Sequence, residues 1–153
     1  MNPTPIPAYN IRAYAPGDWK AMYALDVICF EPPFRFSQRE MRRLAEQRGA
    51  ATLLADAGGE LAGFCIVHHD RNWGYVVTLD VAPAWRRRGV AARLLAEAET
   101  QVREGGAAGM GLHVHNGNSA AIRFYEHMGY GRIGMAEGFY GRGIDALVYR
   151  KMW

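Results

Sequence analysis

The chain has 153 residues, of which 50% are hydrophobic and 22% charged, and its formal net charge at pH 7 is +3. This size predicts a single domain, residues 1–153, and the composition excludes a disordered or fibrous chain. No apolar run is long enough to cross a bilayer, and residues 1–7 lack the basic-then-apolar pattern of a signal peptide. Cys29 and Cys65 are far apart in sequence and form no redox or metal motif. We therefore expect a cytoplasmic protein with reduced thiols and no membrane partner.

The N-terminal third predicts a short strand followed by two helices. Residues 1–8 form a proline-rich lead-in, and a strand is expected at 9–14. Asp18 is a candidate N-cap for the first helix. The run Ser37-Gln38-Arg39-Glu40 is a capping box that opens the second helix. The apolar side of the first helix is expected to consist of Met22, Leu25 and Ile28.

The rest of the chain predicts an antiparallel meander and then two strand–helix–strand steps. Gly89 opens a helix with apolar residues at helical spacing, and a strand at 109–115 follows it. Because a helix connects strands 75–81 and 109–115, we expect these two to be parallel. A helix from Asn118 and two final strands, at 130–135 and 145–151, complete an α/β fold (α+β) with a mixed sheet. The meander strands are expected at 52–55, 61–68 and 75–81.

The connection between the strand at 75–81 and the helix at Gly89 has the composition of a phosphate-binding loop. Pro83 ends the strand, and three arginines at 86–88 precede the glycine. The first N–H groups of a helix have no partner within it and bind anions, which glycine allows to approach closely. The basic clusters at 86–88 and 39–43 fit nucleic acid or, equally, one phosphorylated cofactor. The cluster at 39–43 is also what a solvated helix face would show.

Several segments resemble the GNAT superfamily of acetyl-CoA-dependent N-acetyltransferases. Arg86-Arg87-Arg88-Gly89-Val90-Ala91 resembles the family's pyrophosphate loop, in which Gln or Arg, two residues, Gly, one residue and Gly or Ala link strand to helix. Asn118–Tyr125, followed by Gly129-Tyr130, resembles the family's Asn-x-x-Ala-x-x-x-Tyr segment. Cys29–Pro33 and Phe139–Leu147 resemble the two loops that close over the peptide in RimI-type and eukaryotic N-terminal (Nα) acetyltransferases. The resemblance covers essentially the whole chain.

The resemblance implies the GNAT fold, a meander followed by β-α-β-α-β-β with a parallel strand pair splayed around acetyl-CoA, and it implies catalytic roles. An amine attacks a thioester only as the free base, and His113, in Leu-His-Val, titrates near neutral pH. With Tyr75 it is expected to activate the amine through water. Tyr125 is expected to protonate or hydrogen-bond the departing CoA thiolate, and Asn118 to reach the pantetheine arm.

The same resemblance implies two binding sets. The expected CoA-binding set is Leu79, Asp80, Val81, Arg86, Arg87, Arg88, Gly89, Val90, Ala91, Ala92, Asn118 and Tyr125. The expected acceptor-binding set is Phe30, Glu31, Pro32, Tyr75, Phe139 and Tyr140. Three phenylalanines in the loop after the first helix also suit an apolar acceptor side chain.

Each of these residues also has an ordinary structural interpretation. Tyr125 is at helical spacing and would then be a core aromatic, and His113 a hydrogen-bonded strand histidine. His113 and His115 share one face of a strand, which permits a metal pair, but no third ligand stands nearby and no metal is expected.

The leading hypothesis is direct acetyl transfer to the N-terminal amine of a protein or peptide, with no nucleic-acid partner. The alternatives are a small amine acceptor, such as a polyamine, an amino acid or an antibiotic, and a CoA-binding module without catalysis. The oligomeric state and the arginine that meets the CoA 3′-phosphate stay open at this point.

Overall fold

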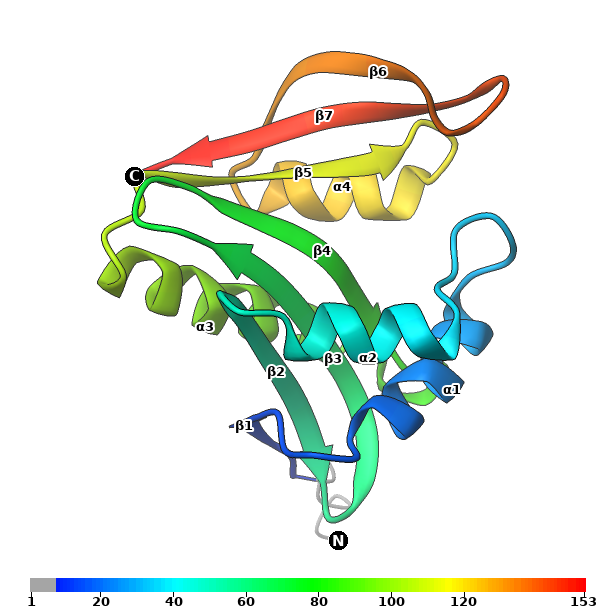
Figure 1. The fold of residues 1–153 in the computed structure, drawn as a ribbon, viewed down its shortest axis with the longest axis vertical. Helices are drawn as coiled ribbons and strands as arrows, with labels where there is room; N and C mark the ends of the chain where they lie inside the picture. Colours follow the sequence, from blue (N-terminus) through cyan, green and yellow to red (C-terminus); the bar gives the residue numbers. More distant parts are fainter. Residues whose placement is uncertain (1–7) are drawn as a thin grey trace, which may run out of the picture.

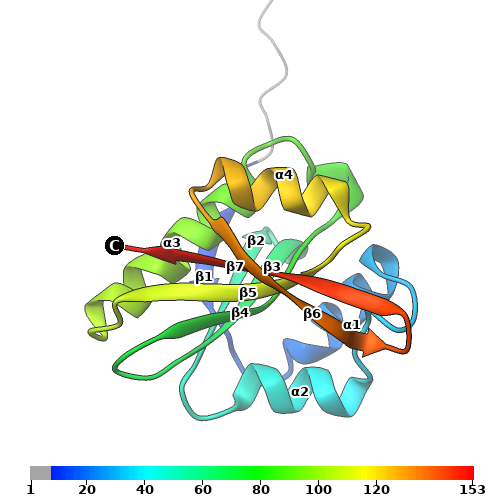
Figure 2. The same cartoon turned by 90° about the horizontal axis from the view of Figure 1, so that it is seen from above.

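A computed structural model describes residues 8–153, and the predicted lead-in lies outside the described residues except for Ala8. These residues form one seven-stranded sheet with helices on both faces (Figures 1 and 2). The strand order is β1-β2-β3-β4-β5-β7-β6. The strands are β1 (Asn10–Ala13), β2 (Ala50–Ala57), β3 (Glu60–His69), β4 (Gly74–Val81), β5 (Gly109–His115), β6 (Gly131–Gly141) and β7 (Ile144–Met152).

The helices divide between the two faces of the sheet (Figure 2). Helices α1 (Trp19–Cys29) and α2 (Gln38–Glu46) cover one face, and α3 (Val90–Glu104) and α4 (Ser119–His127) cover the other. Each face has its own apolar core, and the core under α3 and α4 is the larger of the two. The predicted apolar spacing of α3 is confirmed, because Leu94, Leu95 and Ala98 are fully buried.

The centre of the sheet is where strand pairing changes. Strands β2 to β4 form the predicted antiparallel meander, β1 pairs antiparallel with β2, and β5, β7 and β6 pair antiparallel beyond them. Between the two halves, β4 and β5 are parallel as predicted, but they pair only over 74–76 and 110–112 and then diverge. Against β3, Val77 is an extra residue in β4, because Ile66 pairs with Thr78 and Val67 with Val76. Such a bulge bends a strand, and here the bend coincides with the divergence.

Three local predictions need correction. Ile28 does not lie on the buried side of α1, since 65% of it is exposed, and Asp26 is fully buried there instead. Asp18 precedes α1 but its side chain does not cap the helix. Its carboxylate accepts hydrogen bonds from the Arg12 guanidinium and the Ala15 N–H instead. The capping box is confirmed, with Ser37 and Glu40 bonded reciprocally at the start of α2.

The third correction concerns the C-terminal hairpin. The sequence predicted a connection from Glu137 to Gly143, but β6 continues to Gly141 and turns into β7 through Arg142 and Gly143. Phe139 and Tyr140 therefore project from a strand, with Gly141 paired to Ile144.

Candidate active site

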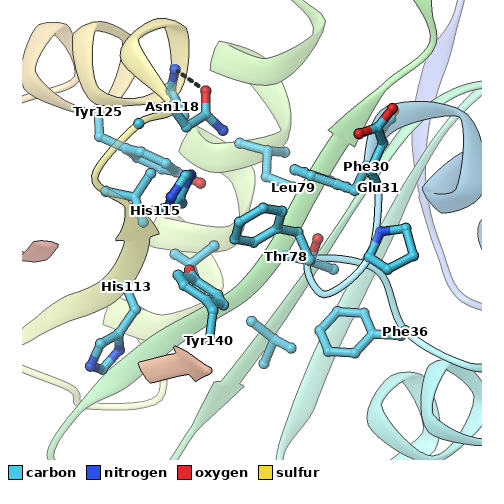
Figure 3. A pocket seen from close by; sticks show the side chains of 18 residues that line it. Phe30, Glu31, Phe36, Thr78, Leu79, His113, His115, Asn118, Tyr125 and Tyr140 are labelled. Atoms are coloured by element: carbon cyan, nitrogen blue, oxygen red, sulfur yellow. Dashed lines mark hydrogen bonds between the residues drawn. The ribbon is translucent and has the colours of Figure 1, made fainter. Parts of the chain in front are cut away.

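A cleft of about 490 Å³ opens where β4 and β5 diverge (Figure 3). The two strands supply facing walls, α4 closes one end, and the loop between α1 and α2 covers the side next to β4. Divergence leaves the inner edge of β4 from Val77 onward without a neighbouring strand. Such an edge presents backbone N–H and C=O groups to a bound molecule. The lining residues are Cys29, Phe30, Glu31, Pro32, Phe34, Phe36, Val76, Val77, Thr78, Leu79, His113, Val114, His115, Gly117, Asn118, Ala121, Tyr125 and Tyr140.

The arginine loop lies between the end of β4 and the start of α3. A short 3-10 helix at Pro83–Trp85 is followed by Arg87 and Gly89 in left-handed conformations, with φ of 62° and 78°. Within the part of the chain that the structure describes, the backbone N–H groups of residues 87–92 have no hydrogen-bond acceptor. Six neighbouring donors at a helix N-terminus, where the helix dipole favours negative charge, form an anion-binding site.

The arginine side chains are partly engaged by the protein itself. Arg86 donates from Nε to the Val81 carbonyl over 3.2 Å, and its guanidinium lies 3.7 Å from the Cys29 Sγ. Arg88 stacks on Trp85, with its guanidinium carbon 5.2 Å from the ring centroid. The backbone of this loop, more than its side chains, is arranged to receive an anion.

Tyr75 and His113 form a hydrogen-bonded pair across the parallel strands. Tyr75 Oη and His113 Nδ1 are 2.8 Å apart, and the tautomer of the imidazole decides which of the two donates. One face of the imidazole stacks on Phe139, with ring centroids 4.0 Å apart and planes 2° from parallel. Burial lowers the pKa of His113 and raises the pKa of Tyr75. The imidazole is therefore neutral at pH 7 and able to accept a proton.

Tyr125 projects from α4 into the cleft with 8% of its surface exposed. Its ring packs edge-on against Phe124 and Tyr130. Burial strongly raises the pKa of its phenol, so the hydroxyl stays protonated and can donate. Among residues 8–153 the Tyr125 hydroxyl has no hydrogen-bond partner, which leaves that donor free for a molecule in the cleft.

Asn118 has a structural role beside its predicted one. Its Oδ1 caps α4 by accepting from the Ala121 N–H over 3.2 Å. The side chain also lines the cleft (Figure 3), so its amide NH₂ group is the part that can meet a bound molecule. The cap fixes the start of α4 and hence the position of Tyr125, two turns further along.

The predicted acceptor side is made of two segments that meet over the cleft. Phe30, Glu31 and Pro32 line it from the loop after α1, and Tyr140 lines it from β6. Burial, with the nearby Tyr75, raises the pKa of Tyr140 to about 12.

The remaining predicted residues lie beside or behind the cleft. Tyr75 and Phe139 do not line it but hold His113 between them. Leu79 lines the cleft, whereas the Asp80 side chain is 1% exposed and Val81 lies beyond the lining. Asp80 pairs with Phe64, which belongs to the core under α1, so its carboxyl group lies on the side of the sheet that α1 covers.

The sequence did not indicate how His115 bridges the acceptor side. Its ring centroid is 4.5 Å from that of Phe34 and 6.1 Å from that of Tyr140, and those two rings also touch. A Cβ at Gly117 would lie 2.8 Å from the His115 ring, so any other residue at position 117 would force that ring to shift. The alternation of His113 and His115 gave the only sequence signal, and it placed the two side chains on one face of the strand without indicating a contact with the loop after α1. Residues 8–153 contain no cluster of three or more potential metal ligands.

Comparison with known proteins identifies the family. The model of the acetyltransferase (GNAT) family matches residues 19–130, and the chain therefore belongs to this family. The chain is 33% identical over 90 residues to acetyltransferase Atu2258 of Agrobacterium fabrum and 36% identical over 87 residues to streptothricin acetyltransferase of Streptomyces lavendulae. These alignments span 59% and 55% of this chain, but only 64% and 46% of those relatives.

Solved structures share the fold along almost the whole chain. The ribosomal-protein-S18-alanine N-acetyltransferase of Escherichia coli matches with a TM-score of 0.84 at 21% identity, covering 95% of this chain and 94% of that one. A nourseothricin acetyltransferase matches with a TM-score of 0.78 at 28% identity, covering 95% and 98%. The predicted GNAT fold is thus confirmed. No helix within residues 8–153 is long and apolar enough to span a membrane.

Proposed function

We propose that this chain is an acetyl-CoA-dependent N-acetyltransferase that acts on the N-terminal amine of a protein or peptide. The observation that carries the proposal is the cleft itself. It is lined by the open edge of β4 and by a free phenol on α4. The unpartnered backbone donors at the start of α3 follow the same strand along the chain. Bound acetyl-CoA would supply the acetyl thioester.

The residues present fit that molecule from its diphosphate to its sulfur. The N–H groups of residues 87–92 and the positive end of the α3 dipole suit the pyrophosphate. Left-handed Gly89 has no atom within 4 Å of the place a Cβ would take, so a phosphate can approach the backbone there. The free β4 edge at Thr78 and Leu79 suits the amides of the pantetheine arm and can polarise the thioester carbonyl.

The acid and base roles follow from the direction of the pKa shifts. His113 has a pKa below its usual value and is held by Tyr75, so a neutral imidazole accepts the proton of the incoming amine through water. Tyr125 keeps its proton and donates a hydrogen bond to the sulfur as the thiolate departs. A thiol has a pKa of about 8.5 and a phenol about 10, and burial widens this gap, so hydrogen bonding accounts for the role without full proton transfer.

The acceptor side favours a chain end with an apolar first residue. Phe30, Phe34, Phe36 and Tyr140 surround it, and Glu31 provides a carboxylate near the entrance. An aromatic wall takes an apolar side chain, and a lone carboxylate attracts a protonated amine.

A second candidate acceptor is a small antibiotic-like amine, and one observation favours it. The streptothricin and nourseothricin acetyltransferases, named for antibiotics, share 36% identity over 87 residues and 28% identity over almost the full length with this chain. Profiling of acceptors separates the two. We expect CoA-thiol release with short peptides bearing an apolar N-terminal residue, and release with streptothricin but with no peptide would replace the first proposal by the second.

A further inference from the structure

Two carboxyl groups that take no part in the proposed chemistry are buried under the cleft. Asp26, on the inner side of α1, is fully buried, and Asp80, on β4, is 1% exposed. Ionised carboxylates are almost never this deeply buried without a cationic or hydrogen-bonding partner.

Each carboxyl group uses one oxygen to hold a wall of the cleft. Asp26 Oδ2 accepts from the Phe36 N–H over 2.8 Å, and Phe36 lines the acceptor side. Asp80 Oδ1 accepts from the Thr78 hydroxyl over 2.6 Å, and Thr78 lines the cleft where β4 leaves β5. The main chain of Asp26 also receives the Phe30 N–H, so both ends of the loop at 30–36 are bonded to Asp26.

The other oxygen of each group points at no donor. Asp26 Oδ1 and Asp80 Oδ2 are fully buried and have no hydrogen-bond partner within the described residues. Burial, together with the neighbouring Asp26 carboxyl group and its negative charge, raises the pKa of Asp80 well above the usual range. One proton shared by the two carboxyl groups would give both of these oxygens a hydrogen bond, because the protonated oxygen donates and the other accepts. Two ionised carboxylates have no donor between them and only repel each other.

We propose that Asp26 and Asp80 share one proton and act as a positioning pair that fastens the acceptor loop at 30–36 to β4. Neither side chain touches the cleft. The inference rests on the proposed function, since it assumes that the loop binds the acceptor. Its chemistry, a proton held between two buried carboxyl groups, is independent of that assumption.

The other groups that face the pair set its pH dependence. Arg86, after β4, lowers the pKa of Asp80, but its guanidinium is engaged by Val81 and lies at the exposed rim. Burial, and to a lesser extent the charge of Asp80, raises the pKa of the thiols of Cys29, on α1, and Cys65, on β3, which therefore stay neutral. Above the raised pKa the pair carries two negative charges, which repel each other, and the loop is released.

The first test is spectroscopic and needs no substrate. Infrared difference spectra of the intact protein are recorded from pH 5 to pH 9, for the native chain and for Asp26→Asn and Asp80→Asn. Glu104→Gln, at the exposed end of α3, is the matched control. We expect the native protein and Glu104→Gln to show the carbonyl band of a protonated carboxylic acid at pH 7, and both Asp variants to lack it. No such band in the native protein at pH 7 would overturn the shared proton.

The second test measures the positioning role. We expect the acceptor KM of the native protein to rise at alkaline pH, where the shared proton is lost. An amide at position 80 supplies the missing donor at every pH, so Asp80→Asn is expected to have the native acceptor KM at pH 7 and to show no such rise. Asp26→Ala frees Phe36 and is expected to raise the acceptor KM about tenfold, with kcat changed less than threefold. An unchanged acceptor KM in Asp26→Ala would refute the role.

The two proposals fail differently. If no amine is acetylated although the infrared band behaves as expected, the proposed function is wrong while the shared proton stands. Acetyl-CoA binding, followed by calorimetry in native protein and Asp80→Asn, is expected to agree within twofold, and a loss of binding in Asp80→Asn would show that the pair shapes the cofactor side instead.

Discussion

Replacing His113 by alanine tests the chemistry of the cleft most sharply. The imidazole is half-buried, it lies 2.8 Å from the Tyr75 hydroxyl, and burial holds its pKa below the usual value of about 6.5. If it accepts the proton of the amine, kcat rises with pH through that lowered pKa and reaches a plateau near neutrality. The rate falls at acid pH because protonation of the imidazole removes the base.

The size of the effect follows from the role of a general base. Such a base contributes about 10²–10⁴-fold, and action through a water molecule favours the lower end, so we expect His113→Ala to lose ~10²-fold in kcat, or about 2.7 kcal/mol. Tyr75→Phe keeps the imidazole and removes one hydrogen bond, worth about 1 kcal/mol, and is expected to lose roughly fivefold.

The assay is steady-state release of CoA thiol with saturating acetyl-CoA, from pH 5 to pH 9. His127→Ala is the control, since His127 ends α4 on the surface. We expect His127→Ala to match the native profile. A His113→Ala protein that keeps both the acid limb and a rate within threefold of native would show that another group, or water alone, removes the proton.

Three further predictions concern the cofactor side and the stability of the fold. Tyr125→Phe is expected to lower kcat by about tenfold or more, because it removes one hydrogen bond to a charged sulfur. The Kd of acetyl-CoA, measured by calorimetry, is expected to stay the same, and an unaltered kcat would contradict the role of Tyr125 as a donor. Gly89→Ala is expected to lower the free energy of unfolding by about 1 kcal/mol, because of the left-handed φ at this position, and to weaken CoA binding about tenfold. Gly58→Ala, at a turn that is also left-handed (φ 66°), is expected to lose stability but to keep its affinity for CoA. Equal CoA affinities in the two variants would contradict the phosphate site. The salt bridge to Arg12 lowers the pKa of Asp18, so Asp18→Asn is expected to cost about 1 kcal/mol at pH 7. Because the folded pKa lies below the unfolded one, this difference is present above pH ~3.9 and is lost as pH falls through the folded pKa. A difference in urea midpoint that did not shrink as the pH fell below ~3.9 would refute it.

Much of the architecture could be predicted from local patterns. Alternating apolar residues and short turns located the meander, Gly89 marked the start of α3, and the capping box marked the start of α2. These signals are reliable because side-chain periodicity, turn residues and helix caps are all set within a few residues of the chain.

The errors arose where distant residues decide the structure. Helical spacing alone favours Ile28 for the core, but Asp26 is the buried residue, because α1 packs over Asp80 of β4. This contact joins residues far apart in sequence, so no local pattern predicts it. The glycine-rich segment at 137–143 has the composition of a loop, yet β6 extends to Gly141, which pairs with Ile144 of β7.

In the candidate site too, contacts between regular elements could be predicted and contacts made by an irregular loop could not. The Tyr75–His113 pair followed from the family resemblance together with the expected parallel strands, and the two side chains are within hydrogen-bond distance. The contact of His115 with Phe34 depends on the path of an irregular loop, which neither periodicity nor motif describes.

The most direct test of the central claim is CoA-thiol release from acetyl-CoA over one panel of acceptors. The panel contains short peptides that differ in their first residue, the same peptides with a blocked N-terminus, and small amines that include a polyamine and streptothricin. We predict release with free N-termini that bear an apolar first residue, none with the blocked peptides, and slower turnover with the small amines. Binding of acetyl-CoA without thiol release for any member of the panel would contradict the account and leave a CoA-binding module.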